Sequence, residues 1–322
     1  MYFYPTTSDA ALIARPTSRV FVSPPRRPAA TLTSRRILLK QLGLVATTVP
    51  AAAVIGGLVD GLLITPNWLV TSDYAFGVPP PATAEAAVAA KNTLRILQVS
   101  DLHLNRIGRL EQSLLQSIHD SHADLIVLTG DVIDAHGSLG SLNILLREFP
   151  SQPRTLAIVG NWEHRSGISL EALGRTYEQH GGELLINRSV EVEKNGSRLR
   201  VTGLDDLIGG VPDAASALRH EKPTSNHLLL VHCPACRDTI RLPTEHSASL
   251  LLAGHTHGGQ VAPGGWALIR PRGSGRYVAG WYDDGGPPMY VSRGIGTSLL
   301  PVRIGATPEL VRIDWSLETQ ES

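Results

Sequence analysis

The sequence of 322 residues has only two cysteines, and both lie in one motif, Cys233-Pro234-Ala235-Cys236. No second pair is present to complete a four-cysteine zinc site. A redox role would need a thioredoxin-like βαβ context, which the surrounding sequence does not show. The simplest interpretation is a turn followed by the start of a helix. A local disulfide formed after export is the alternative that stays open.

The sequence also lacks net charge, because 29 basic residues balance 29 acidic residues. Nucleic-acid-binding domains usually carry a basic patch or stripe, so we expect no nucleic-acid partner. No internal repeat is found. The length suits one large domain preceded by an N-terminal extension.

The N-terminal extension divides into two parts by composition. Residues 1–33 are rich in Pro, Ser, Thr, Ala and Arg without periodicity, which predicts disorder. The segment from Ser34 to Lys40, SRRILLK, precedes a mostly apolar stretch from Leu42 to Ile64 and resembles a twin-arginine export signal. We therefore expect residues 34–64 to engage the Tat export machinery, either as a cleaved signal or as a retained membrane anchor. An ordinary membrane helix with a charged flank is the alternative.

The sequence does contain a series of apolar runs, rich in Val, Ile and Leu, that each end abruptly in potential metal ligands. The runs mostly lack alternation with polar residues, which is typical of strands buried on both faces. In open α/β sheets, ligands bind outside the carboxyl ends of the strands, so the residues that follow these runs should meet. They are Asp101, His103, Asp131, Asn161, His164, His232, His255 and His257.

The most informative run ends in Gly254-His-Thr-His-Gly-Gly-Gln260, which places His255 and His257 two residues apart within a glycine cluster. Neutral imidazole is the commonest side-chain ligand of catalytic transition metals. A lone His-x-His pair is more often two polar loop residues. Four further runs of the same design make a metal site the better interpretation here.

These blocks resemble the pattern of the calcineurin-like metallophosphoesterases, D-x-H, G-D-x-x-D, G-N-H-[DE], a lone H and G-H-x-H. All five occur in order between residues 93 and 313. Gly258-Gly259-Gln260 and residues 290–298 also resemble the exported or membrane-associated bacterial branch. The resemblance implies a mixed α/β fold, a two-sheet β-sandwich flanked by helices, for a domain over residues 65–318.

The resemblance also implies two divalent metal ions, Mn, Fe or Zn, since the ligands are nitrogen and oxygen atoms without thiolates. Asp131 would be the bridging ligand and belong to the catalytic centre. Asp101, His103 and His257 would complete one metal site, and Asn161, His232 and His255 the other.

One position departs from the family pattern. The histidine that usually follows the metal-binding asparagine, and that acts on the phosphoryl oxygens or the leaving group, is Trp162 here. His164 lies two residues further on, so we predict it as the catalytic acid. A loop histidine without a catalytic role is the alternative. Asn161 and Arg293 are predicted to bind the substrate phosphate, Arg293 because it follows the apolar strand MYVS.

Several elements around these runs are readable from spacing. Apolar residues Leu110, Leu114, Leu115 and Ile118 predict a helix, and residues 138–149 and 169–180 predict two more. Residues 184–204 predict a hairpin with Lys194-Asn195-Gly196 at its turn.

We therefore expect hydrolysis of a phosphomonoester or phosphodiester, in the periplasm or cell envelope or tethered to a membrane, on a lipid or cell-wall substrate. A metal-binding relative with little catalysis is one alternative, motivated by Trp162. A nucleotide-lipid pyrophosphatase is the other, and it would favour the cytoplasmic face.

The export signal is directly testable. We predict that replacing Arg35 and Arg36 by Lys leaves the protein in the cytoplasm, because the paired arginines are read by a receptor. Cell fractionation and immunoblotting measure the outcome. Unchanged transport of the variant would indicate a plain membrane anchor instead.

Overall fold

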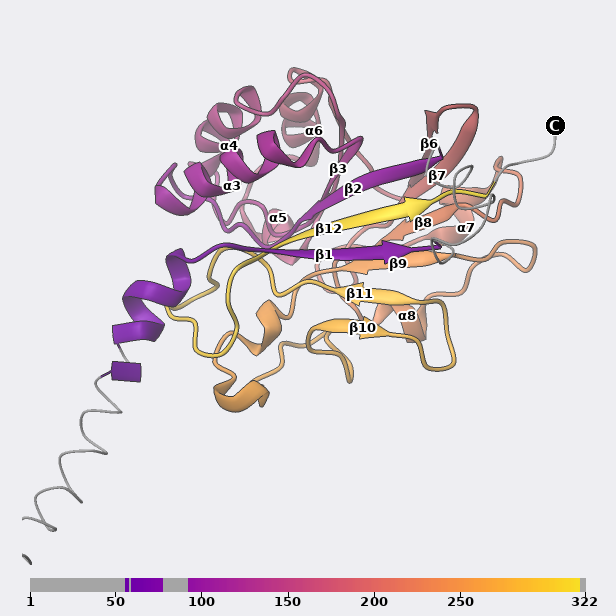
Figure 1. The fold of residues 1–322 in the computed structure, drawn as a ribbon. Helices are drawn as coiled ribbons and strands as arrows, with labels where there is room; N and C mark the ends of the chain where they lie inside the picture. Colours follow the sequence, from indigo (N-terminus) through magenta and orange to yellow (C-terminus); the bar gives the residue numbers. More distant parts are fainter. Residues whose placement is uncertain (1–55, 58, 78–91, 319–322) are drawn as a thin grey trace, which may run out of the picture. The chain divides into compact units, whose positions relative to one another are not determined.

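The computed structural model describes residues 56–57, 59–77 and 92–318 (Figure 1). The predicted disordered segment 1–33 and most of the predicted signal, 34–64, lie outside these residues. Within the described ranges, no helix combines the length and the apolar character needed to cross a bilayer. The described part of residues 59–64 belongs to the same compact unit as the domain, and the backbone N–H of Arg303 donates to the carbonyl of Gly61 over 2.8 Å.

Twelve described strands form two six-stranded sheets. The first sheet has the order β1-β12-β2-β3-β4-β5, in which only the β12–β2 pair is antiparallel. Its strands are β1 (Val70–Phe76), β2 (Thr93–Val99), β3 (Leu125–Thr129), β4 (Arg154–Ile158), β5 (Gly182–Leu184) and β12 (Glu309–Ser316).

The second sheet has the order β10-β11-β9-β8-β7-β6, with antiparallel pairs at its two edges and parallel pairs between. Its strands are β6 (Arg188–Lys194), β7 (Ser197–Gly203), β8 (His227–Leu230), β9 (Leu250–Ala253), β10 (Gly280–Tyr282) and β11 (Met289–Val291). The predicted mixed α/β fold with two sheets is confirmed.

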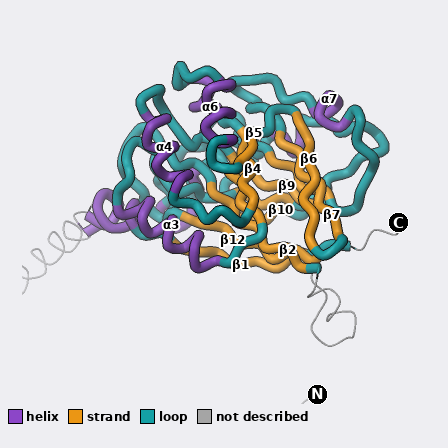
Figure 2. The backbone as a smooth tube through the Cα atoms, turned by 90° about the horizontal axis from the view of Figure 1, so that it is seen from above, coloured by secondary structure: helices purple, strands orange, loops and turns teal. Residues whose placement is uncertain are grey.

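Helices cover the outer faces of the sheets. Figure 2 shows α4 and α6 on one side of the strands and α7 on the other. The longer helices are α3 (Arg109–Ser121), α4 (Ser138–Arg147) and α6 (Leu170–Glu178). The short ones are α5 (Asn161–Arg165), α7 (Ala214–Leu218) and α8 (Cys236–Thr239), with helical turns η1 (Asp60–Ile64), η2 (Thr65–Asn67), η3 (His257–Gly259) and η4 (Pro263–Gly265).

The layering explains why the ligand-bearing strands lack alternation. In β3, Leu125 and Val127 face the core between the two sheets, whereas Ile126 and Leu128 face the helices. Both faces are therefore apolar, and every residue of the strand is buried.

The predicted local elements are found close to their expected bounds. The hairpin is β6 and β7, and Lys194 pairs with Ser197 across the predicted turn. The three predicted helices are α3, α4 and α6.

The cysteine motif forms a turn and the first residue of α8, as the simplest interpretation expected. Both cysteines are free and buried in this structure, and a disulfide formed after export stays a prediction. The Cys233 thiol donates to Asp206 Oδ1 over 3.2 Å, and burial raises the pKa of Cys236 to about 12.

Two of the site's loops are held together by one buried carboxylate. Glu163 in α5 accepts the backbone N–H groups of Gly160 (2.7 Å), Asp131 (2.9 Å), Val132 (2.6 Å) and Ile133 (3.2 Å). Glu163 is 2% exposed, so water cannot replace these bonds. The carboxylate thus fixes the loop after β3 against the loop after β4.

We predict that Glu163→Gln lowers the free energy of unfolding by about 1–3 kcal/mol, because an amide nitrogen cannot accept and leaves a buried N–H without a partner. Urea denaturation measures the change. The control Glu171→Gln removes an exposed helix-surface ion pair with Arg175 and should cost less than about 0.5 kcal/mol. Equal stability of the two variants would contradict the proposed role of Glu163.

Candidate metal centre

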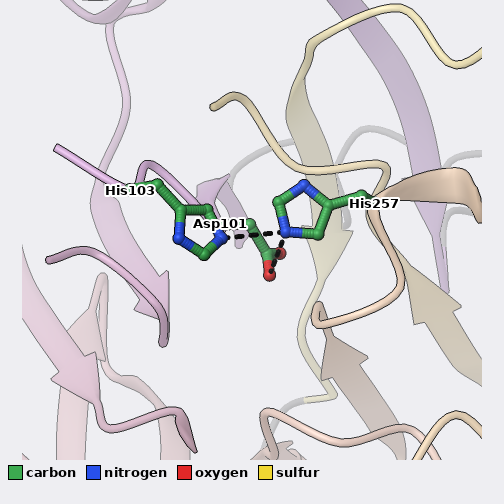
Figure 3. Close-up of side chains that lie close together, drawn as sticks. All are labelled: Asp101, His103 and His257. Atoms are coloured by element: carbon green, nitrogen blue, oxygen red, sulfur yellow. Dashed lines mark hydrogen bonds and ion pairs between the residues drawn. The ribbon is translucent and has the colours of Figure 1, made fainter. Parts of the chain in front are cut away.

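The predicted metal ligands lie together at the carboxyl ends of strands from both sheets. Six of the seven form two buried triads, in each of which one ligand atom per residue lies within 4.8 Å of the others. The first triad is Asp101, His103 and His257, whose side chains point toward one another in Figure 3, and the second is Asp131, His232 and His255. These are the groupings that the family resemblance implied, with Asp131 now placed in the second.

Asp131 faces both triads through one oxygen. Its Oδ2 lies 3.1 Å from His232 Nε2 in its own triad and 4.0 Å from His103 Nε2 in the other. The second oxygen, Oδ1, accepts the backbone N–H of Trp162 over 2.8 Å. A carboxylate oxygen in this position is suited to bridge two metal ions.

The seventh predicted ligand, Asn161, carries the clearest sign of an unfilled coordination site. Asn161 is 4% exposed, and its Oδ1 is buried without a hydrogen-bond partner. A buried amide oxygen without a partner is unfavourable by about 1–3 kcal/mol. A divalent cation beside the second triad would satisfy this oxygen, so the donor set fits the implied metals.

The outer nitrogens of three histidines are held by acceptors, so the inner nitrogens are turned toward the other candidate ligands, where a metal would bind. His232 Nδ1 donates to the Thr129 carbonyl and His255 Nε2 to the Arg272 carbonyl, both over 2.8 Å. His103 Nδ1 donates to the Asp134 carboxylate. The inner His103 Nε2 lies 2.9 Å from His257 Nε2.

The candidate ligands include both an ionised carboxylate and a neutral imidazole. Burial favours neutral Asp131, but the charge and hydrogen bond of His232 outweigh it and lower the pKa of Asp131 to about 2. Burial, and then the charge of His232, lower the pKa of His255 to about 4, so this imidazole is neutral and ready to ligate.

The backbone at the site is strained. Five ligands have φ in the left-handed region: Asp101 (52°), His103 (46°), Asp131 (51°), His255 (73°) and His257 (51°). Non-glycine residues rarely adopt this conformation, and such strain concentrates at functional sites.

The glycines beside the ligands provide space. A Cβ at Gly160 would overlap Asp131 Oδ1 and lie 2.6 Å from the Asp131 nitrogen. The sequence motif therefore needs glycine there for close approach of the two loops.

A cavity of about 510 Å³ opens beside the ligands. Asp131, Asn161, His255 and His257 form part of its wall, and the rest is largely apolar. The lining also includes Trp162, Arg165, Ile208, Ile269, Arg272, Leu299, Leu300 and Val302. A phosphoester with a sizeable organic group has room to reach the ligands.

His164 and Arg293 are not among the residues that line this cavity. His164 Nε2 lies 2.7 Å from Asp205 Oδ1 and the histidine packs against Gly209. Arg293 Nη2 donates to Glu309 Oε1 over 3.0 Å, which ties it to a buried carboxylate. The predicted roles of both residues in catalysis and substrate binding stay predictions.

Three residues of the site were missed by sequence reasoning. Asp134 ends the G-D-x-x-D block and Glu163 ends the G-N-H-[DE] block. The sequence pattern therefore marked both positions, but it did not indicate what either residue does. Arg303 had no signal. It is fully buried, and its Nη2 lies 3.3 Å from His257 Nδ1, so it helps to orient that ring.

Comparison with known proteins agrees with this geometry. A family model described as calcineurin-like phosphoesterase matches residues 94–259. The uncharacterized metallophosphoesterase YkuE of Bacillus subtilis (strain 168) is 34% identical over 224 residues, which cover 67% of this chain and 77% of that protein. The phosphodiesterase YaeI of Escherichia coli (strain K12) is 28% identical over 227 residues, which cover 68% of this chain and 81% of that protein.

The family model spans more than half of the chain, and the matched residues 94–259 include all seven predicted metal ligands. The chain therefore belongs to the calcineurin-like phosphoesterases and is a metal-dependent phosphohydrolase.

Proposed function

We propose that the protein uses two divalent metal ions to hydrolyse a phosphodiester, on a lipid or cell-wall substrate outside the cytoplasm. The observation that carries the two-metal part is the position of Asp131 Oδ2, which faces a histidine of each triad. The diester preference is supported by the size of the cavity beside the ligands and by the name of the relative YaeI. The location is supported by Arg35-Arg36 before an apolar stretch.

Asp101, His103 and His257 would hold one ion, Asn161, His232 and His255 would hold the other, and Asp131 would serve both. Such a pair, when bound, supplies Lewis acidity toward a water molecule and toward the phosphoryl oxygens. The chain's own contribution is to exclude bulk water from the buried ligands and to orient the ester. The apolar cavity wall binds the organic group of the substrate.

A proton donor to the leaving group is needed where the family pattern has histidine and this chain has Trp162. His164 lies one helical turn after Asn161 in α5. Its Nε2 lies 2.7 Å from the Asp205 carboxylate, which holds the ring in place. We therefore assign the donor role to His164.

The substrate class is tested with purified protein loaded with Mn and assayed on aryl phosphodiesters, aryl phosphomonoesters and a nucleotide pyrophosphate. We expect the diester to have the highest kcat/KM. A preference for the monoester or for the pyrophosphate would overturn the diester assignment.

For the bridging ligand, we predict that Asp131→Asn abolishes activity and lowers metal content more than any other single ligand substitution, because both ions lose a negatively charged ligand. Elemental analysis per chain measures the loss. Asn161→Ala is the matched comparison and should affect one ion only. Two ions retained in Asp131→Asn would show that Asp131 does not bridge.

For the proton donor, we predict that His164→Ala slows hydrolysis of alkyl esters by about 10²–10⁴-fold and of nitrophenyl esters only weakly. Nitrophenolate leaves without protonation, so the difference isolates acid catalysis.

His164→Gln serves as the control, since a glutamine can still donate a hydrogen bond to Asp205 but cannot transfer a proton. It should show the same dependence on the leaving group as His164→Ala. Equal slowing of both ester types would instead indicate stabilisation of the phosphoryl oxygens. Recovery of alkyl-ester activity in His164→Gln would make the histidine a structural residue.

A further inference from the structure

The exposed apolar side chains of this protein are concentrated at one end. Of the thirteen large hydrophobic residues that are exposed in the described part of the chain, ten lie on three segments, 59–68, 266–269 and 299–300. We call these segments the apolar rim. Leu299 is 87% exposed and Trp266 is 80% exposed, which is unusual for tips that have no partner.

Backbone and side-chain hydrogen bonds join the three segments of the apolar rim into one surface. Gln260 Nε2 donates to the carbonyls of Ser298 and Leu300, both over 3.0 Å, and Leu268 N donates to Val261 O over 3.2 Å. The bond from Arg303 N to Gly61 O adds the segment 59–68.

The apolar rim surrounds the openings to the metal centre. Ile269, Leu299 and Leu300 line the cavity of about 510 Å³ that reaches His255 and His257. Leu62 lines a second cavity, of about 420 Å³, that reaches His103. A partner seated on the rim would therefore lie directly over the ligands.

The charges beside the apolar rim are mainly basic. Arg270 and Arg272 directly follow Ile269 and are exposed, and residues 256–280 contain neither aspartate nor glutamate. Arg106, Arg109 and Glu111 stand with Leu62 in the wall of the second cavity, and Asp60 in the segment 59–68 accepts a hydrogen bond from Thr65 Oγ1. Apolar tips with flanking arginines, and with tryptophan at positions 68 and 266, are typical of surfaces that enter a lipid interface.

The chain itself leads to this surface. The mostly apolar stretch that begins at Leu42 ends at Ile64, and residues 59–64 are part of the apolar rim.

We propose that the apolar rim docks on a bilayer containing anionic lipids, with Trp266, Ile269, Leu299 and Leu300 entering the head-group and upper acyl layer. Arg270 and Arg272 then contact lipid phosphates. The metal centre faces the membrane surface and receives phosphoesters from it. Docking requires neither metal nor turnover, so it can fail while the proposed hydrolysis holds, and the reverse.

The test uses the full chain with Leu299→Cys labelled by an environment-sensitive fluorophore. Cys233 and Cys236 are buried and burial raises the pKa of both thiols, so the label goes to position 299. With vesicles of phosphatidylcholine and phosphatidylglycerol, we expect a blue shift, a severalfold rise in emission and quenching by brominated acyl chains. The matched control is Ile144→Cys, an exposed apolar position in α4, which should stay unchanged.

The apolar stretch from Leu42 to Ile64 can bind vesicles by itself. The label at position 299 reports whether the apolar rim also contacts the membrane. Protein that floats with vesicles while the label at position 299 stays in water would overturn the proposal. A shift that follows protein concentration without vesicles would overturn it in favour of a second copy of the chain.

The contribution of Arg270 and Arg272 to docking is tested separately. Arg270→Gln with Arg272→Gln should raise the lipid concentration for half-maximal label response roughly 25-fold, from a factor of about five for each arginine. Arg219→Gln at the end of α7 is the control and should have no effect. An equal response to vesicles of phosphatidylcholine alone would overturn the requirement for anionic lipid.

Discussion

The structure depends on the placement of one carboxylate, that of Asp131, between histidines from different sheets. His103 follows β2 in the first sheet, and His232 follows β8 in the second. Both approach Asp131 Oδ2, at 4.0 Å and 3.1 Å. The six other candidate ligands can gather near Asp131 only if the two sheets pack face to face with their carboxyl ends at one edge. The sandwich core is therefore what gives the centre its geometry.

The fold stabilises an arrangement that is locally unfavourable. Five ligand residues with left-handed backbone each cost on the order of 1–3 kcal/mol. Burial of carboxylates and imidazoles adds an unfavourable desolvation free energy, and Asn161 Oδ1 has no hydrogen-bond partner. Glu163, with four backbone N–H donors, and Arg303, which is fully buried, hold the loops in place. Such preorganisation suits a centre that is completed by metal, because binding then relieves the unfavourable terms.

The candidate metal ligands alone do not specify a substrate, and the apolar rim beside them is the second feature that bears on it. The apolar cavity wall has room for the organic group of an ester, and the exposed tips of loops 266–269 and 299–300 are the reason that we propose a lipid surface as its source. Loops positioned by a rigid sheet scaffold are where relatives of one fold differ in substrate. In this protein the candidate metal ligands stand at the strand ends, and exposed apolar side chains stand on the loops beyond them.

The sequence by itself determined the candidate ligands and the strands that carry them. Each apolar run ends in its ligand within a few residues, so Asp101, His103, Asp131, Asn161, His232, His255 and His257 could be identified from local pattern and family resemblance. The hairpin and the three longer helices followed from turn residues and apolar periodicity, which are also local. These features depend on neighbours in the chain, so they can be read from the order of residues.

Only the tertiary structure decided what depends on distant residues. The partner of Arg293 is Glu309 and the partner of His164 is Asp205, and neither pairing has a sequence signal. Arg303 reaches His257 across 46 positions of the chain. The apolar rim is assembled from segments that lie more than two hundred residues apart at its extremes, 59–68 and 299–300. Contacts of this kind arise from how the two sheets and their loops pack, since burial and charge pairing are properties of neighbours in space.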